Sequence, residues 1–391
     1  MLDWLMIGGG IQGTALAFYL VQRRRVKREE LRILDPHDRL LARWQQMTTS
    51  VGMDYLRSPG VHHLHDDPWS LQTFAQTQAG QPLARYIPVF HRPSLDLFNA
   101  HSAALIERAR LQDLHVQARA EGLHRLENSE GWRVQTSAGD LEARRVVLAI
   151  SPTEQPYWPE WAVALREQGA PVSHIFENGF RRESLLTHES IVVLGGGITA
   201  AQSALALARE KPGAVTLLMR HDIRLSNFDS DPCWVTRLCL DEFYATSDLI
   251  ERRAIIKRAR QRGSMPTDVA EALAQSVESG LLRVVVGEVV QAETNVGAID
   301  LALNTGARLT ADALLLATGF DSKRPGGAWL DAAIAENNLP TAPDAYPVVD
   351  SALCWSPGLY VMGALAELEI GPTARNFIGA RLAVARIGTV I

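Results

Sequence analysis

The sequence LDWLMIGGGIQG, residues 2–13, decides how the fold of this chain begins. Its first half is an apolar run of strand length, which stops at a cluster of glycines. A helical pattern of apolar residues follows over residues 14–20, and a second apolar run, LRIL at 31–34, ends at Asp35. This order of strand, glycine turn, helix, strand and acid predicts a βαβ unit that binds a dinucleotide.

The residue types in the glycine turn suit the binding of a pyrophosphate. Gly8 allows a tight turn, Gly10 lets the backbone approach the pyrophosphate, and Gly13 lets helix and strand pack closely. The amides at the helix start, that of Gln12 among them, present the positive end of the helix dipole to the phosphates. Asp35 can accept both hydrogen bonds of an adenosine ribose. A GxGxxG motif also occurs in units that bind nothing, but the flanking strand, helix and acid favour a dinucleotide.

A second unit of the same kind begins near the middle of the chain. The apolar run IVVL at 191–194 leads into GGGITA at 195–200, and the next apolar run after the helical pattern is VTLLM at 215–219. Gly195 and Gly197 occupy the places of the first two glycines of the motif. Two such motifs in one chain are far more specific than either motif alone.

The residue that follows the second strand of this unit is basic. Arg220 stands twenty residues after Ala200, at the place where the first unit has Asp35. An acid at this place binds a free ribose hydroxyl, whereas an arginine suits a 2′-phosphate. The second nucleotide is therefore predicted to be NADP(H) rather than NAD(H), with Arg224 as a candidate to assist.

The overall composition excludes several classes of function. The chain has 391 residues, 47% of them hydrophobic, and a net charge of −5, so we expect two or three domains and no general affinity for nucleic acid. No apolar stretch approaches the roughly eighteen residues that span a membrane, and the N-terminus shows no basic leader. We therefore expect a soluble, cytoplasmic protein without a nucleic-acid or membrane partner.

The cysteines and the clustered histidines do not indicate a metal site. Cys233, Cys239 and Cys354 form no CxxC pair, so we expect buried or half-buried thiols rather than a dithiol redox centre or a zinc knuckle. HHLHDD at 62–67 has no second ligand group at helical spacing, and it is interpreted as a polar loop near the cofactor. No metal is predicted.

Two glycine-terminated strands are expected in the last part of the chain. LLLATGF at 314–320 has the pattern of a buried strand that ends at Thr318 and Gly319, where the chain should cross back to the first domain. GLYVMG at 358–363 is a further strand, which stops at Gly363.

A closing helix and a basic helix leave alternatives open. GPT at 371–373 opens the closing helix, and Arg375 and Asn376 in its first turn either cap and solvate the helix or contact the cofactor or the substrate. Residues 248–262 form a basic helix, which either attracts the phosphates of a mobile cofactor or presents a solvated face.

Several further segments carry a resemblance to a known family. They are WQQM at 44–47, LRSP at 56–59, Ser173-His174, and the stretch 228–244 that ends in EFY. Together with both glycine motifs, these segments resemble the flavin-dependent N-hydroxylating monooxygenases of lysine and ornithine. Neither the redox CxxC of the disulfide reductases nor the fingerprint of the Baeyer–Villiger monooxygenases is present.

Two departures from that family concern the substrate. The family's substrate-binding lysine, in a Phe-Leu-Lys-Asp element, has no counterpart before Leu56, and its Thr-Asn-Tyr element appears only as GSMPT at 263–267. The amino-acid-binding roles therefore do not carry over. We expect a substrate other than free lysine or ornithine.

The resemblance implies an α/β fold with two Rossmann-like, three-layer dinucleotide-binding domains, of which the NADPH domain is inserted in the FAD domain. The expected limits are 1–165 and 312–391 for the FAD domain and 186–311 for the NAD(P)H domain. The residues implied in cofactor binding are Gly8, Gly10, Gln12, Gly13, Asp35, Trp44, Gly195, Gly197, Arg220, Thr318, Gly319 and Gly363. Trp44, Met47 and Asn376 are the hypotheses for groups near the flavin ring.

The implied activity is that of an FAD- and NADPH-dependent oxidoreductase, and above all of a monooxygenase that uses O2 and a small-molecule substrate. One alternative is a reductase that passes electrons from NADPH to a quinone or a small redox protein. Another alternative is a flavin-binding sensor or partner protein, although two intact glycine motifs argue against a scaffold without activity. A homo-oligomer is possible on any of these interpretations.

Overall fold

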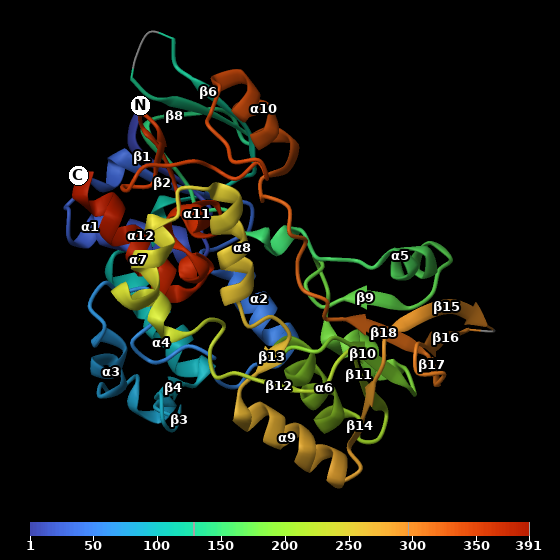
Figure 1. Cartoon of the computed structure of the whole chain (residues 1–391). Helices are drawn as coiled ribbons and strands as arrows, with labels where there is room; N and C mark the ends of the chain where they lie inside the picture. Colours follow the sequence, from blue (N-terminus) through green and yellow to red (C-terminus); the bar gives the residue numbers. More distant parts are fainter. Residues whose placement is uncertain (128–129, 296, 391) are drawn as a thin grey trace.

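The computed structural model describes residues 1–127, 130–295 and 297–390, which form two α/β lobes (Figure 1). Both chain termini lie in the first lobe (Figure 1). Its central sheet has the strand order β19-β20-β8-β1-β2-β5. These strands are β1 (Leu2–Ile7), β2 (Leu31–Asp35), β5 (His115–Gln117), β8 (Leu141–Leu148), β19 (Cys354–Ser356) and β20 (Leu359–Val361), and the hairpin of β6 (Ala120–Arg125) and β7 (Trp132–Thr136) extends the sheet from β8.

The first predicted βαβ unit is confirmed at the centre of this sheet. β1 pairs in parallel with both β2 and β8, and four of its six residues are buried. α1 (Ile11–Gln22) follows the glycine turn and packs against α12 (Phe377–Ile387) from the end of the chain. The N-terminal glycine turn and the C-terminal helix are thereby brought together.

The second lobe contains the second predicted unit. Its parallel sheet has the order β14-β11-β10-β18-β9. The elements of this lobe are β9 (Val172–His174), β10 (Ile191–Leu194), α6 (Ile198–Glu210), β11 (Val215–Met219), α9 (Thr267–Glu278), β14 (Leu282–Val286), the meander β15 (Val289–Asn295), β16 (Ala298–Leu303), β17 (Arg308–Ala311), and finally β18 (Ala313–Leu316). The predicted fold class, with a nucleotide domain inserted in another, is confirmed.

The second sheet extends beyond the expected limits 186–311 on both sides. β18 pairs with β10, and β9 pairs with β18, so the sheet reaches from residue 172 to residue 316. The run ALLL of β18 is fully buried. Such a run suits a central strand of either sheet, so its partner is decided by tertiary packing and not by its own pattern.

Residues 226–263, called the covering segment below, leave the second lobe and lie on the first. They begin after β12 (Arg224–Leu225) and end before β13 (Ser264–Met265), two short strands that pair in parallel. Their helices α7 (Arg237–Ala245) and α8 (Leu249–Ala259) lie beside α12 and α11 (Glu367–Ile370) of the first lobe (Figure 1). Phe243 and Ile256 of the covering segment join a small buried cluster with Tyr346 and Leu368 of the first lobe.

The remaining helices surround the first sheet or join the lobes. They are α2 (Ala42–Val51), α3 (Ser70–Ala75), α4 (Leu95–Arg108), α5 (Glu160–Glu167) and α10 (Gly327–Asn337), and a short hairpin of β3 (Tyr86–Ile87) and β4 (Arg92–Pro93) lies between α3 and α4 in the chain. Across residues 1–127, 130–295 and 297–390, no helix combines the length and the apolar character needed to cross a membrane.

The expectation of buried or half-buried thiols was wrong for two of the three cysteines. Cys233 and Cys239 form a disulfide within the covering segment, with their Cα atoms 5.4 Å apart. A 3₁₀ turn, η6 (Pro232–Val235), is followed directly by α7, and this compact path brings the two residues within disulfide range. Cys354 is a free, half-buried thiol as expected.

The histidine-rich loop at 62–67 folds back on its own backbone. The amide of His65 donates to Nδ1 of His63 at 3.2 Å, and the amide of Asp67 donates to Nδ1 of His65 at 2.9 Å. The ring of His63 also packs 4.9 Å from that of His101. Burial lowers the pKa of His62 and His63 to about 4 and that of His101 to about 3.

Because the pKa values of these histidines are lowered, we expect the protein to lose stability in acid. Their pKa values lie below the ordinary value near 6.5, so the unfolded chain binds more protons as the pH falls from about 6.5 to about 4. Each of these histidines then lowers the free energy of unfolding by on the order of 1.4 kcal/mol per pH unit. Denaturant melts at pH 7 and pH 5 should show this loss, and His101→Gln should reduce it.

The control for this measurement is His91→Asn, because His91 is exposed and its backbone φ of +47° is one that asparagine adopts. It should leave the pH dependence of the free energy of unfolding as in the parent protein. Equal pH dependence in the parent and in His101→Gln would contradict the role of the buried histidines.

Candidate functional site

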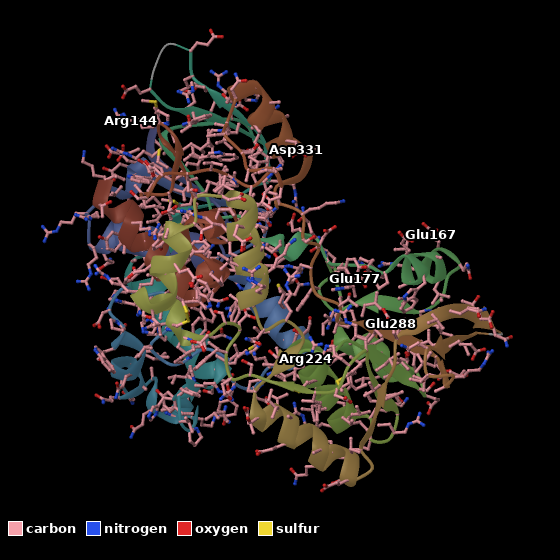
Figure 2. The ribbon with its side chains drawn as sticks, viewed as in Figure 1. Arg144, Glu167, Glu177, Arg224, Glu288 and Asp331 are labelled. Atoms are coloured by element: carbon pink, nitrogen blue, oxygen red, sulfur yellow. A yellow bond between two sulfur atoms is a disulfide. The ribbon has the colours of Figure 1, made fainter. Side chains whose placement is uncertain are left out.

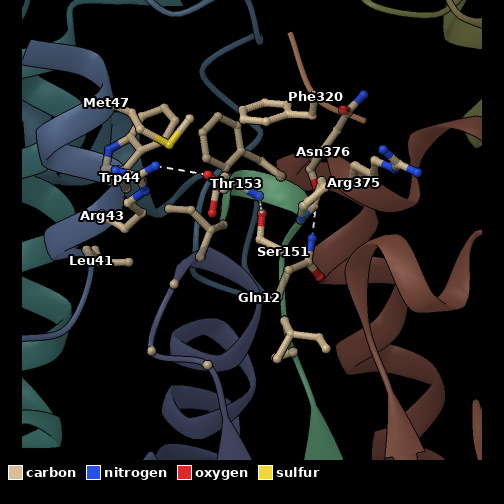
Figure 3. Close-up of a pocket in the computed structure, with 18 of the residues that line it drawn as sticks. Gln12, Leu41, Arg43, Trp44, Met47, Ser151, Thr153, Phe320, Arg375 and Asn376 are labelled. Carbon is tan, nitrogen blue, oxygen red and sulfur yellow. Dashed lines mark hydrogen bonds between the residues drawn. The ribbon is translucent and has the colours of Figure 1, made fainter. Parts of the chain in front are cut away.

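A cavity of about 1040 Å³ opens at the C-terminal edge of the first sheet (Figure 3). Its walls come from the first glycine turn, α2, the start of α12, the crossover after β8, and the covering segment. Figure 3 shows Trp44 and Met47 on one side of this space and Arg375 and Asn376 on the other. Elements from both ends of the chain and from the insertion therefore share one cavity.

The first glycine turn is closed at its back and open toward the cavity. A Cβ on Gly8, whose φ is +116°, would lie 2.6 Å from the carbonyl oxygen of Ala149, and one on Gly13 would lie 1.9 Å from the carbonyl oxygen of Gly8. A Cβ on Gly10 would meet no atom within 4 Å, and Gly10 lines the cavity. This arrangement fits a pyrophosphate bound against the turn.

Asp35 lies beside the turn as an ionised acceptor. Its carboxylate accepts from the amide of Gly9 at 2.7 Å and from the amide of His37 at 3.0 Å. Burial opposes ionisation, but the hydrogen bonds from His37 and Gly9 outweigh it and hold the pKa of Asp35 below its usual value. Because Asp35 also lines the cavity, its carboxylate can accept ribose hydroxyls.

The far end of the cavity offers buried polar atoms to a ligand. Nε2 of Gln12 donates to the carbonyl oxygens of Ala374 and Asn376, the latter at 3.3 Å (Figure 3). Among the residues that the structure describes, Oε1 of Gln12 and the hydroxyl of Thr373 are buried without a hydrogen-bond partner. Such orphaned atoms need a partner, and the polar edge of a flavin would supply one.

Trp44, Met47 and Asn376 all line this cavity, as the sequence interpretation places them near one another. Trp44 donates its indole N–H to Oδ1 of Asn99 at 3.0 Å, and its ring packs 5.3 Å from that of Phe377. Asn376 begins α12, and its side chain makes no capping hydrogen bond to the helix. Which cofactor group each residue touches stays a prediction.

Thr318, Gly319 and Gly363 lie outside the lining of the cavity. The hydroxyl of Thr318 donates to the carbonyl oxygen of Tyr157, and the amide of Tyr157 donates to that of Gly319 at 2.9 Å. Gly363, with φ +62°, leaves room for Gln12, since a Cβ there would lie 3.2 Å from Cγ of Gln12. These residues hold the crossover and Gln12 in place rather than facing the cavity.

The second glycine turn has the same closed back as the first. A Cβ on Gly195 would lie 2.6 Å from the carbonyl oxygen of Ala317, and one on Gly197 would lie 3.4 Å from Cα of Gly263. Ile198, the first residue of α6, lines the cavity of the first lobe. The start of the second nucleotide-binding helix thus reaches the space beside the first.

The basic residues after β11 are exposed, as a nucleotide phosphate would require. Arg220 directly follows the strand, and Arg224, labelled in Figure 2, lies in β12. Neither residue lines the large cavity. The structure therefore places Arg220 at the edge of the second sheet, next to the second glycine turn but away from the first.

The covering segment closes the cavity through contacts that the sequence interpretation did not name. Nη2 of Arg57 donates to the carbonyl oxygens of Ser226 and Phe228 at 2.8 and 2.7 Å, and the ring of Phe90 packs 4.6 Å from that of Phe228. Thr373 was also missed, although its place in the GPT opening of a helix was a signal for it. The contacts of Arg57 had no local signal.

Two family models match the chain. A model described as FAD-NAD(P)-binding matches residues 5–153, and one described as pyridine nucleotide-disulphide oxidoreductase matches residues 133–376, more than half of the chain. Among curated proteins, the chain is 21% identical over 218 residues to the uncharacterized oxidoreductase CzcO of Bacillus subtilis (strain 168), a match that covers 54% of this chain and 53% of that protein. The matched part thus spans about half the length of this relative.

Solved structures of similar fold include three amine monooxygenases. DfoA, a cadaverine monooxygenase from Erwinia amylovora bound to FAD, is 16% identical with a TM-score of 0.76, covering 100% of this chain and 95% of that one. The ornithine N-hydroxylase KtzI of Kutzneria sp. 744, with reduced FAD, NADP+ and L-ornithine, is 15% identical with a TM-score of 0.77, covering 100% and 98%. L-lysine 6-monooxygenase from Pseudomonas syringae is 16% identical with a TM-score of 0.75, covering 100% and 99%.

At these identities the solved structures establish the fold alone, whereas the two family models together cover both glycine turns and the second model matches more than half of the chain. The closed backs of both glycine turns and the open front of the first turn agree with that assignment. The chain therefore belongs to the pyridine nucleotide-disulphide oxidoreductase family and is an oxidoreductase with sites for FAD and NAD(P)H.

Proposed function

We propose that this protein is an FAD- and NADPH-dependent monooxygenase that hydroxylates the nitrogen of an amine other than free lysine or ornithine. The observation that carries the proposal is the shared cavity, which the first glycine turn, Trp44, Asn376, Ile198 and the covering segment all line. Similarity of fold to three amine monooxygenases supports the same class of reaction.

The residues of this chain fit the two ends of FAD. The turn at Gly8–Gly10 and Asp35 would hold the pyrophosphate and the adenosine ribose, and Gln12 and Thr373 would hold the polar edge of the ring. When bound, the flavin would accept a hydride from NADPH and would transfer one oxygen atom of O2 to the substrate.

The protein's own part in the reaction is to position the substrate and to exclude water. Trp44 packs against Phe377, and Phe320 stacks 4.9 Å from Phe176, so aromatic rings form the wall around the ring end of the cavity. Phe228 of the covering segment completes this wall. An apolar enclosure of this kind favours transfer of oxygen to the substrate over its release as peroxide.

The charged groups of the cavity argue against an amino acid as substrate. Arg43 donates to the carbonyl oxygen of Thr153 at 2.9 Å, Arg57 binds carbonyl oxygens of the covering segment, and Arg119 pairs with Glu154 at 2.8 Å. These contacts engage the guanidinium groups of Arg57 and Arg119 and both Nη atoms of Arg43, of which only the buried Nε lacks a partner among the described residues. The family's substrate-binding lysine has no counterpart here. We therefore expect an amine that carries no α-carboxylate.

The reaction itself can be tested by its stoichiometry. A primary amine, O2, NADPH and a proton should give the hydroxylamine, water and NADP+, so one O2 is consumed for each NADPH oxidised when the right amine is present. An oxygen electrode, NADPH absorbance and mass spectrometry of products across a panel of diamines and arylalkyl amines would measure this. Oxidation of NADPH that needs a quinone or a disulfide acceptor, and not O2, would instead establish the reductase.

Gly10→Val should remove FAD while leaving the fold intact. The backbone of Gly10 has φ −76°, which valine can adopt, and a Cβ there has open space around it. The isopropyl group would nevertheless occupy the side of the turn that faces the cavity. We expect a colourless protein with the far-ultraviolet circular dichroism of the parent; a yellow variant would show that the pyrophosphate lies elsewhere.

Arg220→Ala should change the choice of nicotinamide cofactor. If the guanidinium binds the 2′-phosphate, KM for NADPH rises about tenfold, equivalent to roughly 1.4 kcal/mol, while KM for NADH stays the same. Arg308→Ala, an exposed arginine on β17 of the same lobe, is the matched control and should change neither value. Equal effects on both cofactors would contradict a contact with the 2′-phosphate.

A further inference from the structure

Glu367 is a buried carboxylate that no step of the proposed reaction uses. It lies at the start of α11 with 1% of its side chain exposed. Three guanidinium groups surround it: those of Arg253 and Arg260 from the covering segment, and that of Arg375 from the 3₁₀ turn η8 (Pro372–Arg375). One acid thus joins the covering segment to the turn that precedes α12.

The contacts on the two sides of Glu367 are specific. Arg375 binds both carboxylate oxygens, Nε to Oε2 and Nη2 to Oε1, each at 2.8 Å. Arg260 binds Oε2 at 2.8 Å, and Arg253 binds Oε1 and also pairs with Asp344. A bidentate guanidinium–carboxylate pair fixes the orientation of both partners, so the position of Arg375 follows that of Glu367.

The electrostatics keep this group of residues charged and closed. Burial would raise the pKa of Glu367, but Arg260 and Arg375 lower it to about 2, so the carboxylate is ionised at any working pH. Arg253 also lies 4.0 Å over the ring of Tyr346, whose hydroxyl accepts from Arg375 at 3.0 Å. Removing one member of such a buried set leaves the remaining charges without compensation.

The covering segment also holds the backbone of the same turn directly. Arg260 donates to the carbonyl oxygen of Pro372 at 3.4 Å, and Arg252 donates to that of Leu368 at 3.1 Å. The next residue after Pro372 is Thr373, whose buried hydroxyl lines the cavity. The contact of Arg260 with Pro372 therefore lies one residue from Thr373, a candidate to bind the ligand.

We propose that Glu367 is a positioning residue, which couples the docking of the covering segment to the placement of Thr373 and Asn376 at the ring end of the cavity. The proposal rests on the proposed function in taking that ligand to be FAD. On this view the site for the flavin ring is complete only while α8 is docked. Of the basic residues expected on a helix at 248–262, Arg252, Arg253 and Arg260 bind the first lobe.

Hydrogen exchange on the full-length protein tests the coupling without any cofactor. Arg253→Met removes from the covering segment a guanidinium that binds Glu367, retains the pair of Glu367 with Arg375, and leaves the direct contact of Arg260 with Pro372 in place. If the coupling holds, amide exchange at residues 373–376 speeds up about tenfold in this variant, although the substitution lies in another segment. Glu367→Gln should speed exchange both there and over residues 249–259.

The matched control is Glu251→Gln. Its carboxylate pairs with Arg258 of the same helix at 2.8 Å, and both side chains are more than half exposed. It should leave exchange at residues 373–376 within about twofold of the parent. Unchanged exchange at 373–376 in Arg253→Met would overturn the coupling.

Titration of the apoproteins with FAD tests the consequence for the site. Glu367→Gln should raise Kd for FAD about tenfold and shift the visible absorption of the bound flavin, whereas Glu367→Asp, which keeps the charge, should restore part of both. An unchanged Kd and spectrum in Glu367→Gln would overturn the positioning role. Failure of the parent protein to bind FAD would instead overturn the proposed function, and the exchange experiment would still decide the coupling.

Discussion

The ion pairs between Glu367 and the arginines of the covering segment are the constraint on which the closed cavity depends. The covering segment also contributes apolar contacts: Phe243 and Ile256 join the buried cluster with the first lobe, and Trp234, Leu249 and Ile255 pack against that cluster. Charges are costly to bury, and the cost is offset here because one carboxylate receives several guanidinium donors in good geometry. At the wall of the cavity the same segment is held by Arg57 and Phe90, which contact Phe228.

The parts of the fold that could be predicted from the sequence are those whose signal is local. Each βαβ unit is encoded within about thirty-five residues by strand length, glycine spacing and helical periodicity, and both units lie where these patterns indicate. The candidate site could be predicted to the same extent. Gly8, Gly10 and Asp35 follow from the motif of the turn, Trp44 and Met47 from the resemblance of their segment, and Asn376 from the opening of the closing helix.

The parts that could not be predicted depend on which distant partner a segment chooses. Nothing around Glu367 indicates that it will meet arginines more than one hundred residues earlier in the chain, and the run ALLL of β18 fits either sheet. The disulfide between Cys233 and Cys239 escaped prediction because the spacing lacks a known motif and only the path of the backbone brings the thiols together. The hydrogen bonds of Thr318 and Gly319 to Tyr157 likewise join distant segments and have no local signal.

The paired strands β12 and β13 have a mechanical consequence. The covering segment leaves and re-enters the second lobe through these two adjacent strands, whereas its far end is anchored on the first lobe by ion pairs. The covering segment is therefore attached to both lobes, by its backbone at β12 and β13 and by ion pairs at Glu367. The cavity of the first lobe is thus completed by residues whose chain path begins and ends in the second lobe.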